Sequence, residues 1–174
     1  MKTTAPSLRP ATEDDSELLY RIYASTRDEE LAAVPWDAPA KEAFLRMQFA
    51  AQDTYYRATY PGASYDLIVD GEEALGRLYV GRGPAAWLVI DLALLPGHRG
   101  KGIGTGLLSD VLEQAAAAAR PVQIHVERFN PARRLYARLG FDQIADQGVY
   151  LLLEWRPQVK SQESALAAYP NTAS

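Results

Sequence analysis

The sequence contains no cysteine, and its only histidines are His98 and His125. Without cysteine the chain has no disulfide, no thiolate nucleophile and no cysteine ligand for a metal. Two histidines also exclude a histidine-rich metal centre. We therefore expect a protein that binds no metal and carries no covalent intermediate on sulfur.

Long hydrophobic runs and an excess of positive charge are also missing. No run approaches the roughly 20 apolar residues of a membrane span, and the first ten residues lack the apolar core of a secretory signal. The net charge of −4 and the pI near 5.2 argue against general nucleic-acid binding. We expect a soluble, cytoplasmic protein that binds neither membranes nor nucleic acid.

The length of 174 residues suits one ordinary domain that buries its core without cross-links. Residues 1–156 hold the recognisable strand and helix patterns. Residues 157–174 are rich in serine, alanine and glutamine and show no periodicity, so we interpret them as a C-terminal tail, whose order is left open.

What the sequence does contain is a basic, glycine-rich turn, R-G-K-G-I-G-T-G at residues 99–106. An apolar run precedes it, and a helical stripe of apolar residues follows, so the helix begins inside the turn. Unpaired N–H groups, the helix dipole and basic side chains favour an anion there. The spacing is neither a Walker loop nor Gly-x-Gly-x-x-Gly. The turn therefore predicts a phosphate site of another kind.

Strand and helix patterns alternate along the rest of the chain. Helices are expected after Thr12, from Asp37 to before Pro61, over 102–119, and from Asn130, as a cap, to Leu139. Strands are expected at Ser7 to Pro10, Tyr65 to Val69, Leu75 to Val80, Ala85 to Leu95, Pro121 to Glu127, Phe141 to Ala145 and Val149 to Trp155.

Two motifs resemble those of the general N-acetyltransferase (GNAT) superfamily. Arg99-x-x-Gly102-x-Gly104 is similar to its acetyl-CoA loop, and the run from Asn130 to Phe141 resembles its second signature. The resemblance implies an α/β (α+β) fold, with a mixed, mostly antiparallel sheet of about seven strands and about four helices. It also implies transfer of acetyl from acetyl-CoA to the amine of a small molecule or peptide. A homodimer is left open.

The same resemblance assigns the cofactor contacts. Main-chain groups at the end of a central strand would hold the pantetheine arm and the thioester carbonyl, and the glycine turn would hold the diphosphate. Asn130 lies six positions before Tyr136, where seven is common in the family, so a plain helix cap is an equal alternative for it. The expected cofactor residues are Leu92, Ala93, Leu94, Arg99, Gly100, Lys101, Gly102, Ile103, Gly104, Thr105 and Asn130.

Three side chains are candidates for catalysis. Tyr136 matches the residue that in many relatives donates to the CoA sulfur, although a packing role is the alternative. His125 lies on the polar face of its strand, and it is either a general base or a hydrogen-bonded structural residue. Asp91 interrupts an apolar strand, so it is either hydrogen-bonded for structure or faces a cleft as a base or amine ligand. Glu127, or no dedicated base, is also open.

Aromatic residues are frequent in the second helical region, which in GNAT proteins forms a wall of the acceptor cleft. By resemblance the candidates for acceptor binding are Trp36, Tyr55, Tyr56 and Tyr60, and packing against the sheet is the alternative. Other readings of the chain are an inactive acyl-CoA-binding sensor, transfer of a longer acyl group, or transfer to a hydroxyl.

Overall fold

The computed structural model describes residues 5–158. Its strands form one seven-stranded sheet in the order β1-β2-β3-β4-β5-β7-β6. All neighbouring strands are antiparallel except β4 and β5, which run parallel. The strands are β1 Ser7–Pro10, β2 Ser64–Asp70, β3 Glu73–Arg82, β4 Trp87–Leu94, β5 Val122–Glu127, β6 Asp142–Asp146 and β7 Tyr150–Trp155. The predicted mixed, mostly antiparallel sheet is confirmed.

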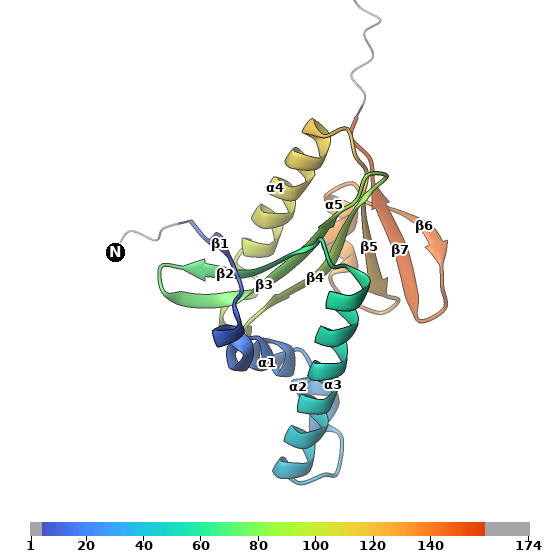
Figure 1. Ribbon diagram of the computed structural model, residues 1–174. Coiled ribbons are helices and arrows are strands. Elements are labelled where there is room, and N and C mark those ends of the chain that lie inside the picture. The colour runs from blue at the N-terminus through green and yellow to red at the C-terminus, as the bar shows by residue number, and fades with distance from the viewer. Residues whose placement is uncertain (1–4, 159–174) are drawn as a thin grey trace, which may run out of the picture.

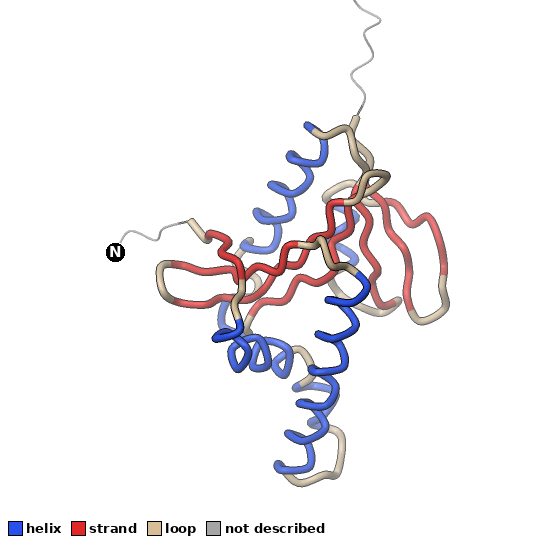
Figure 2. The backbone as a smooth tube through the Cα atoms, viewed as in Figure 1, coloured by secondary structure: helices blue, strands red, loops and turns tan. Residues whose placement is uncertain are grey.

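Helices cover both faces of this sheet. Those on one face come from the N-terminal third, and those on the other follow β4 and β5 (Figure 1). They are α1 Ser16–Ser25, α2 Asp28–Ala32, α3 Ala38–Thr59, α4 Ile103–Ala117 and α5 Arg133–Arg138. The short α2 was not predicted. In Figure 2 the C-terminal end of α3 lies beside the sheet, and its N-terminal part runs away from the strands.

The core has a separate part on each face of the sheet. On one face, Leu108 and Val111 of α4 and Tyr136 of α5 pack with apolar residues of β3, β4, β5 and β7. On the other, Ile22 of α1 packs against Leu67 of β2. The central strands are therefore covered on both sides, which explains their nearly continuous apolar runs.

Most predicted boundaries are confirmed. Asp37 caps α3, because its Oδ1 accepts from the amide of Ala40 at 2.9 Å. The prediction that Asn130 caps its helix is wrong. That helix begins at Arg133, and Asn130 Oδ1 accepts instead from the amide of Ala132 at 2.9 Å, closing a turn before the helix. Most of the predicted tail, 159–174, lies outside the described residues.

Strands β4 and β5 pair only at their beginnings. The parallel ladder joins Trp87–Val89 to Val122–Ile124 and then stops. A register shift against β3 places an extra residue, Ile90, in β4 where the ladder ends. Beyond it, each strand continues with its other neighbour, β4 with β3 and β5 with β7. The sheet therefore opens between β4 and β5. Within residues 5–158, no helix is long and apolar enough to cross a membrane.

Candidate active site

A cleft of about 300 Å³ lies where β4 and β5 separate. Residues of α1, α2 and α3 line it on one side, and residues of β5, α5 and β7 on the other. The predicted site residues that it brings together are Asp91, Leu92, Ala93, His125, Asn130, Tyr136 and Tyr56. Predicted site residues that are far apart in the sequence therefore lie close together where β4 and β5 separate.

The free edge of β4 is made by alternate residues. Leu95 donates its amide to Leu75 of β3 at 2.8 Å, and Ala93 pairs with Arg77 in the same ladder. Because main-chain groups alternate in direction along an antiparallel strand, Leu92 and Leu94 direct theirs away from β3, toward the opening. Ala93 contributes its side chain to the cleft, while its main chain belongs to the β3 ladder.

The glycine turn leads from β4 into α4. Gly100 and Gly102 have φ of 70° and 80°, which a side chain would strain, and Gly102 is the N-cap of α4. Among the turn amides, that of Gly106 bonds back to the carbonyl of Gly102 at 3.0 Å. The amides of Ile103, Gly104 and Thr105 are the first of the helix and have no intrahelical acceptor. They form an N–H cradle of the kind that holds phosphate groups.

Of the basic residues near this cradle, Arg99 and His98 are engaged elsewhere. Arg99 donates to the carbonyl oxygens of Leu94 and Ser25, and His98 Nε2 lies 3.3 Å from a carboxylate oxygen of Glu73. Lys101 is exposed and has no ion pair within the part of the chain that the structure describes. Its ammonium group is therefore available to an anion.

Tyr136 lies on α5 at the opening, with only 7% of its surface exposed. Its ring packs edge-on against Phe141, with 5.8 Å between the centroids. The residue therefore packs in the core and lines the cleft at the same time. Burial, and to a smaller extent the charge of Asp91, raise its pKa to about 12. The phenol therefore holds its proton throughout the neutral range and can act as a donor.

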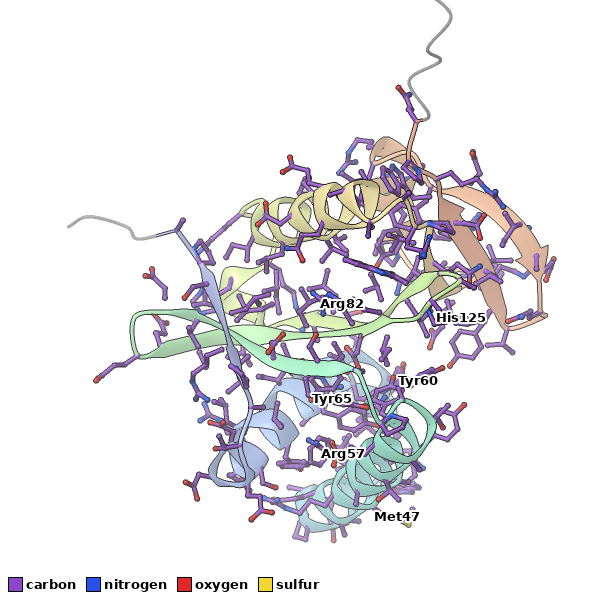
Figure 3. The ribbon with its side chains drawn as sticks, turned by 45° about the horizontal axis from the view of Figure 1, so that its top comes forward. Met47, Arg57, Tyr60, Tyr65, Arg82 and His125 are labelled. Atoms are coloured by element: carbon purple, nitrogen blue, oxygen red, sulfur yellow. The ribbon has the colours of Figure 1, made fainter. Side chains whose placement is uncertain are left out.

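His125 and Glu127 occupy the exposed face of β5, and alternate residues of that strand are buried, as predicted. Figure 3 labels His125 on β5 and Tyr60 just after the end of α3. The side chains of His125 and Glu127 both line the cleft. His125 and Glu127, two of the residues considered as a base, therefore lie together at the opening. Asn130 follows them in the turn before α5.

Asp91 is paired with an arginine that the sequence did not point to. Arg77 of β3 is 2% exposed, and its Nη2 lies 2.7 Å from Asp91 Oδ2 and 2.9 Å from Oε1 of Gln52 on α3. The guanidinium also lies 5.0 Å from the ring centroid of Tyr79. Among the described residues, Arg77 Nε and the Tyr79 hydroxyl are buried without a hydrogen-bond partner. A buried polar group that is incompletely paired needs an explanation, such as an ordered water or a functional role.

Of the four aromatic candidates for the acceptor wall, one lines the cleft and three do not. Tyr56 lines the cleft, and burial raises its pKa above its usual value. Trp36, Tyr55 and Tyr60 are not among the lining residues. Trp36 packs edge-on against Phe44 with centroids 5.4 Å apart, and Tyr55 is 58% exposed.

Other aromatic, polar and charged residues line the cleft without having been predicted as site residues. They are Tyr23, Arg27, Glu30, Gln52, Arg77 and Tyr150. Only the charged pair Arg27 and Glu30, three residues apart, shows a local sequence signal. The remainder meet through the packing of α1 and α3 on the sheet. Within residues 5–158, no group of three or more histidine, aspartate or glutamate side chains is arranged to hold a metal ion.

Part of the chain matches a known family. Residues 63–143, which run from β2 to β6 and include the glycine turn, match the family model described as an acetyltransferase (GNAT) domain. No curated protein matches the chain.

Solved structures match nearly the whole chain at low identity. The PaiA N-acetyltransferase from Thermoplasma acidophilum, in complex with coenzyme A, has a TM-score of 0.68 at 15% identity, covering 88% of this chain and 99% of that one. An acetyltransferase from Thermus thermophilus has a TM-score of 0.67 at 22% identity, covering 90% and 99%. A histone acetyltransferase HPA2 and related acetyltransferase from Corynebacterium glutamicum has 0.61 at 24%, covering 91% and 99%. The predicted fold is thus confirmed.

Proposed function

We propose that the chain is an N-acetyltransferase that moves acetyl from acetyl-CoA directly to a primary amine, because residues 63–143 match an acetyltransferase (GNAT) domain and the chain has the fold of solved acetyltransferases. The observation that supports this most is the opening between β4 and β5. It has an N–H cradle beside one end and a protonated phenol, an imidazole and a carboxylate within it. These are the groups that acetyl transfer to an amine requires.

The residues present fit a CoA thioester. Positive φ at Gly100 and Gly102 and open space around Gly106 leave the cradle free of side chains, and Lys101 adds positive charge beside it. The main-chain groups of Leu92 and the amide of Leu94 suit the amides of a pantetheine arm, while the carbonyl oxygen of Leu94 already accepts from Arg99 Nε. Bound acetyl-CoA supplies the activated acyl carbon, and every other task falls to the chain.

Two side chains have distinct tasks in the transfer. His125 accepts the proton that an ammonium acceptor must lose before its nitrogen can attack, directly or through one water. Tyr136 donates a hydrogen bond to the sulfur as negative charge develops there. Since the sequence has no cysteine to carry the acyl group, the transfer is direct.

A panel assay tests the proposal. The protein is mixed with acetyl-, propionyl- or succinyl-CoA and with small amines or peptides, while free CoA is followed by a thiol reagent and products by mass. We expect CoA release that depends on an amine and a product heavier by one acetyl group. Binding of acetyl-CoA without release favours the sensor alternative, and faster release from propionyl- or succinyl-CoA favours a longer acyl group.

A further inference from the structure

The charges that line the cleft are unequally paired. Its arginines are Arg27 and Arg77, and no lysine among the described residues lines it. Arg27 Nη1 lies 2.9 Å from Glu30 Oε1, and Arg77 Nη2 lies 2.7 Å from Asp91 Oδ2. Each cation therefore already has a carboxylate partner. An acceptor that carried a carboxylate or phosphate would find no free cation here.

Carboxylate oxygens, by contrast, remain available. The one hydrogen bond to the Asp91 carboxylate from the described residues comes from Arg77 Nη2 and uses Oδ2. The side chain lines the cleft and is 15% exposed, so Oδ1 is left open there. Glu127 also lines the cleft and has no ion pair within residues 5–158. The cleft thus has unpaired carboxylate oxygens for a cationic group, whereas both of its arginines are already paired with carboxylates.

Asp91 is also held rigidly. Arg77 is buried, and it is fixed in turn by Gln52 from α3 and by its stacking over Tyr79. The ion pair spans β3 and β4 at the bulge, where β4 leaves β5. A carboxylate oxygen fixed in this way forms short, charge-assisted bonds with an ammonium group and need not be reorganised when the group arrives.

On the basis of the proposed function, we propose that Asp91, positioned by Arg77, binds the ammonium group of the acceptor through Oδ1. The acceptor class that this selects is a cationic amine with no carboxylate or phosphate beside its nitrogen. Asp91 is then a specificity-determining ligand, and Arg77 is a positioning residue that acts through it. Tyr23, Tyr56 and Tyr150 line the same cleft and suit an apolar or aromatic body on the amine.

The native protein allows a direct test with three matched probes, 2-phenylethylamine, phenylalaninamide and phenylalanine. They share the ring and the amine, and only phenylalanine has a carboxylate. With saturating acetyl-CoA, kcat/KM is measured for each and corrected for the fraction of each probe that is in the ammonium form. We expect the first two to be similar and phenylalanine to be at least about tenfold worse, because its carboxylate meets unpaired carboxylates. Equal values for phenylalanine and 2-phenylethylamine would overturn the inference.

Substitution of Asp91 tests the same contact from the protein side. Asp91→Asn should raise KM for 2-phenylethylamine about tenfold or more, and leave acetyl-CoA affinity and the pH profile of kcat in place. It should also reduce the difference in kcat/KM between phenylalanine and 2-phenylethylamine. Loss of a merely structural contact would not change that difference. Asp91→Glu, which keeps the charge, should restore part of the loss. Asp110→Asn, on the exposed surface of α4 and outside the cleft, is the matched control.

The outcomes separate this inference from the function on which it rests. A protein that binds acetyl-CoA and acetylates no amine overturns both. A protein that acetylates amino acids as well as the parent amines overturns the inference alone, as does folded Asp91→Asn with native KM. Because removal of Asp91 leaves a buried guanidinium unpaired, Asp91→Asn can fail to fold. In that event the comparison of the three probes on the native protein decides.

Discussion

Arg99 Nε donates to the carbonyl oxygen of Leu94 at 2.8 Å and so ties the glycine turn back to the end of β4. The same guanidinium reaches the carbonyl oxygen of Ser25, the last residue of α1, through Nη2 at 3.2 Å. Lys101 lies two positions later, on the exposed side of the turn. The two cations therefore have different tasks, since Arg99 shapes the turn and Lys101 presents charge.

We therefore expect Lys101→Gln and Arg99→Gln to differ. Lys101→Gln should weaken acetyl-CoA binding a few fold, reduce the dependence of that affinity on salt, and leave the melting temperature unchanged, because an exposed charge acts weakly and is screened. Arg99→Gln should lower the melting temperature as well as the affinity. Calorimetry at two salt concentrations and thermal unfolding measure both. Native affinity and native salt dependence in Lys101→Gln would remove that residue from the phosphate site.

Gly104 should be required for cofactor binding. A Cβ at this position has ordinary contact with Leu92 Cδ2 at 3.7 Å, so the fold tolerates a side chain there. Gly104→Glu would, however, place a negative group at the first turn of α4, where the diphosphate must lie. Calorimetry should show loss of acetyl-CoA binding while circular dichroism stays native.

Gly62→Glu serves as its control. Gly62 has nothing within 4 Å of an added Cβ and lies in the connection from α3 to β2, away from the cradle. It should bind acetyl-CoA normally. If the folded Gly104→Glu protein binds as well as Gly62→Glu, the glycine turn is not the diphosphate site.

The elements that could be predicted from the sequence are those with a local physical cause. The stripe from Leu107 to Ala115 and the alternation from Val122 to Val126 follow from burial on one face, and Gly71 and Gly140 sit where the backbone needs positive φ. The helix α2, with three acidic residues in its first turn, has too short an apolar stripe to stand out.

The charge pairs of the site could not be predicted in this way. Arg77 meets Asp91 because β3 and β4 pair in one register with a bulge at Ile90, and it meets Gln52 because α3 packs over that face. Neither the strand register nor the helix packing can be recognised from the residues that flank Arg77 in the sequence. Asp91 could be recognised as unusual from its apolar neighbours, but its partner could not.

Tyr136→Phe should lower turnover and leave acetyl-CoA affinity nearly unchanged, because the hydroxyl is needed as charge develops on the sulfur. A fall in kcat of about 10- to 1000-fold fits the loss of a catalytic donor. Steady-state kinetics and calorimetry on the same preparation measure the two quantities. Full turnover in the variant would mean that the residue only packs against Phe141.

The same residue should make stability sensitive to alkali. Its pKa is about 12 in the folded protein and about 10 in an unfolded chain, so the folded state holds the proton more tightly. This contribution to stability is complete below pH 10 and is lost as the pH rises toward 12. Denaturant unfolding from pH 9 to 12 should show a smaller fall in the free energy of unfolding for Tyr136→Phe than for the native protein. An identical fall would contradict the burial of this phenol.

His125 should set the lower limb of the pH profile of turnover. A base must be unprotonated to accept the proton of an ammonium acceptor, so activity rises with pH as the base loses its own proton. His125→Gln keeps a polar side chain of similar size and cannot accept the proton. It should lower the plateau rate and remove the inflection. His98→Gln changes the other histidine, which lies near Glu73 and does not line the cleft, and should leave the profile unchanged.

Asp91→Asn completes this comparison, because a carboxylate in the same cleft is the competing base. If Asp91 binds the ammonium group and His125 takes its proton, Asp91→Asn changes KM and keeps the inflection, while His125→Gln does the reverse. If instead His125→Gln keeps both the rate and the inflection, and Asp91→Asn loses them, then Asp91 is the base. Arg77 would in that case hold a proton acceptor in place, and selection of the cation would fall to Glu127, the remaining unpaired carboxylate of the described cleft.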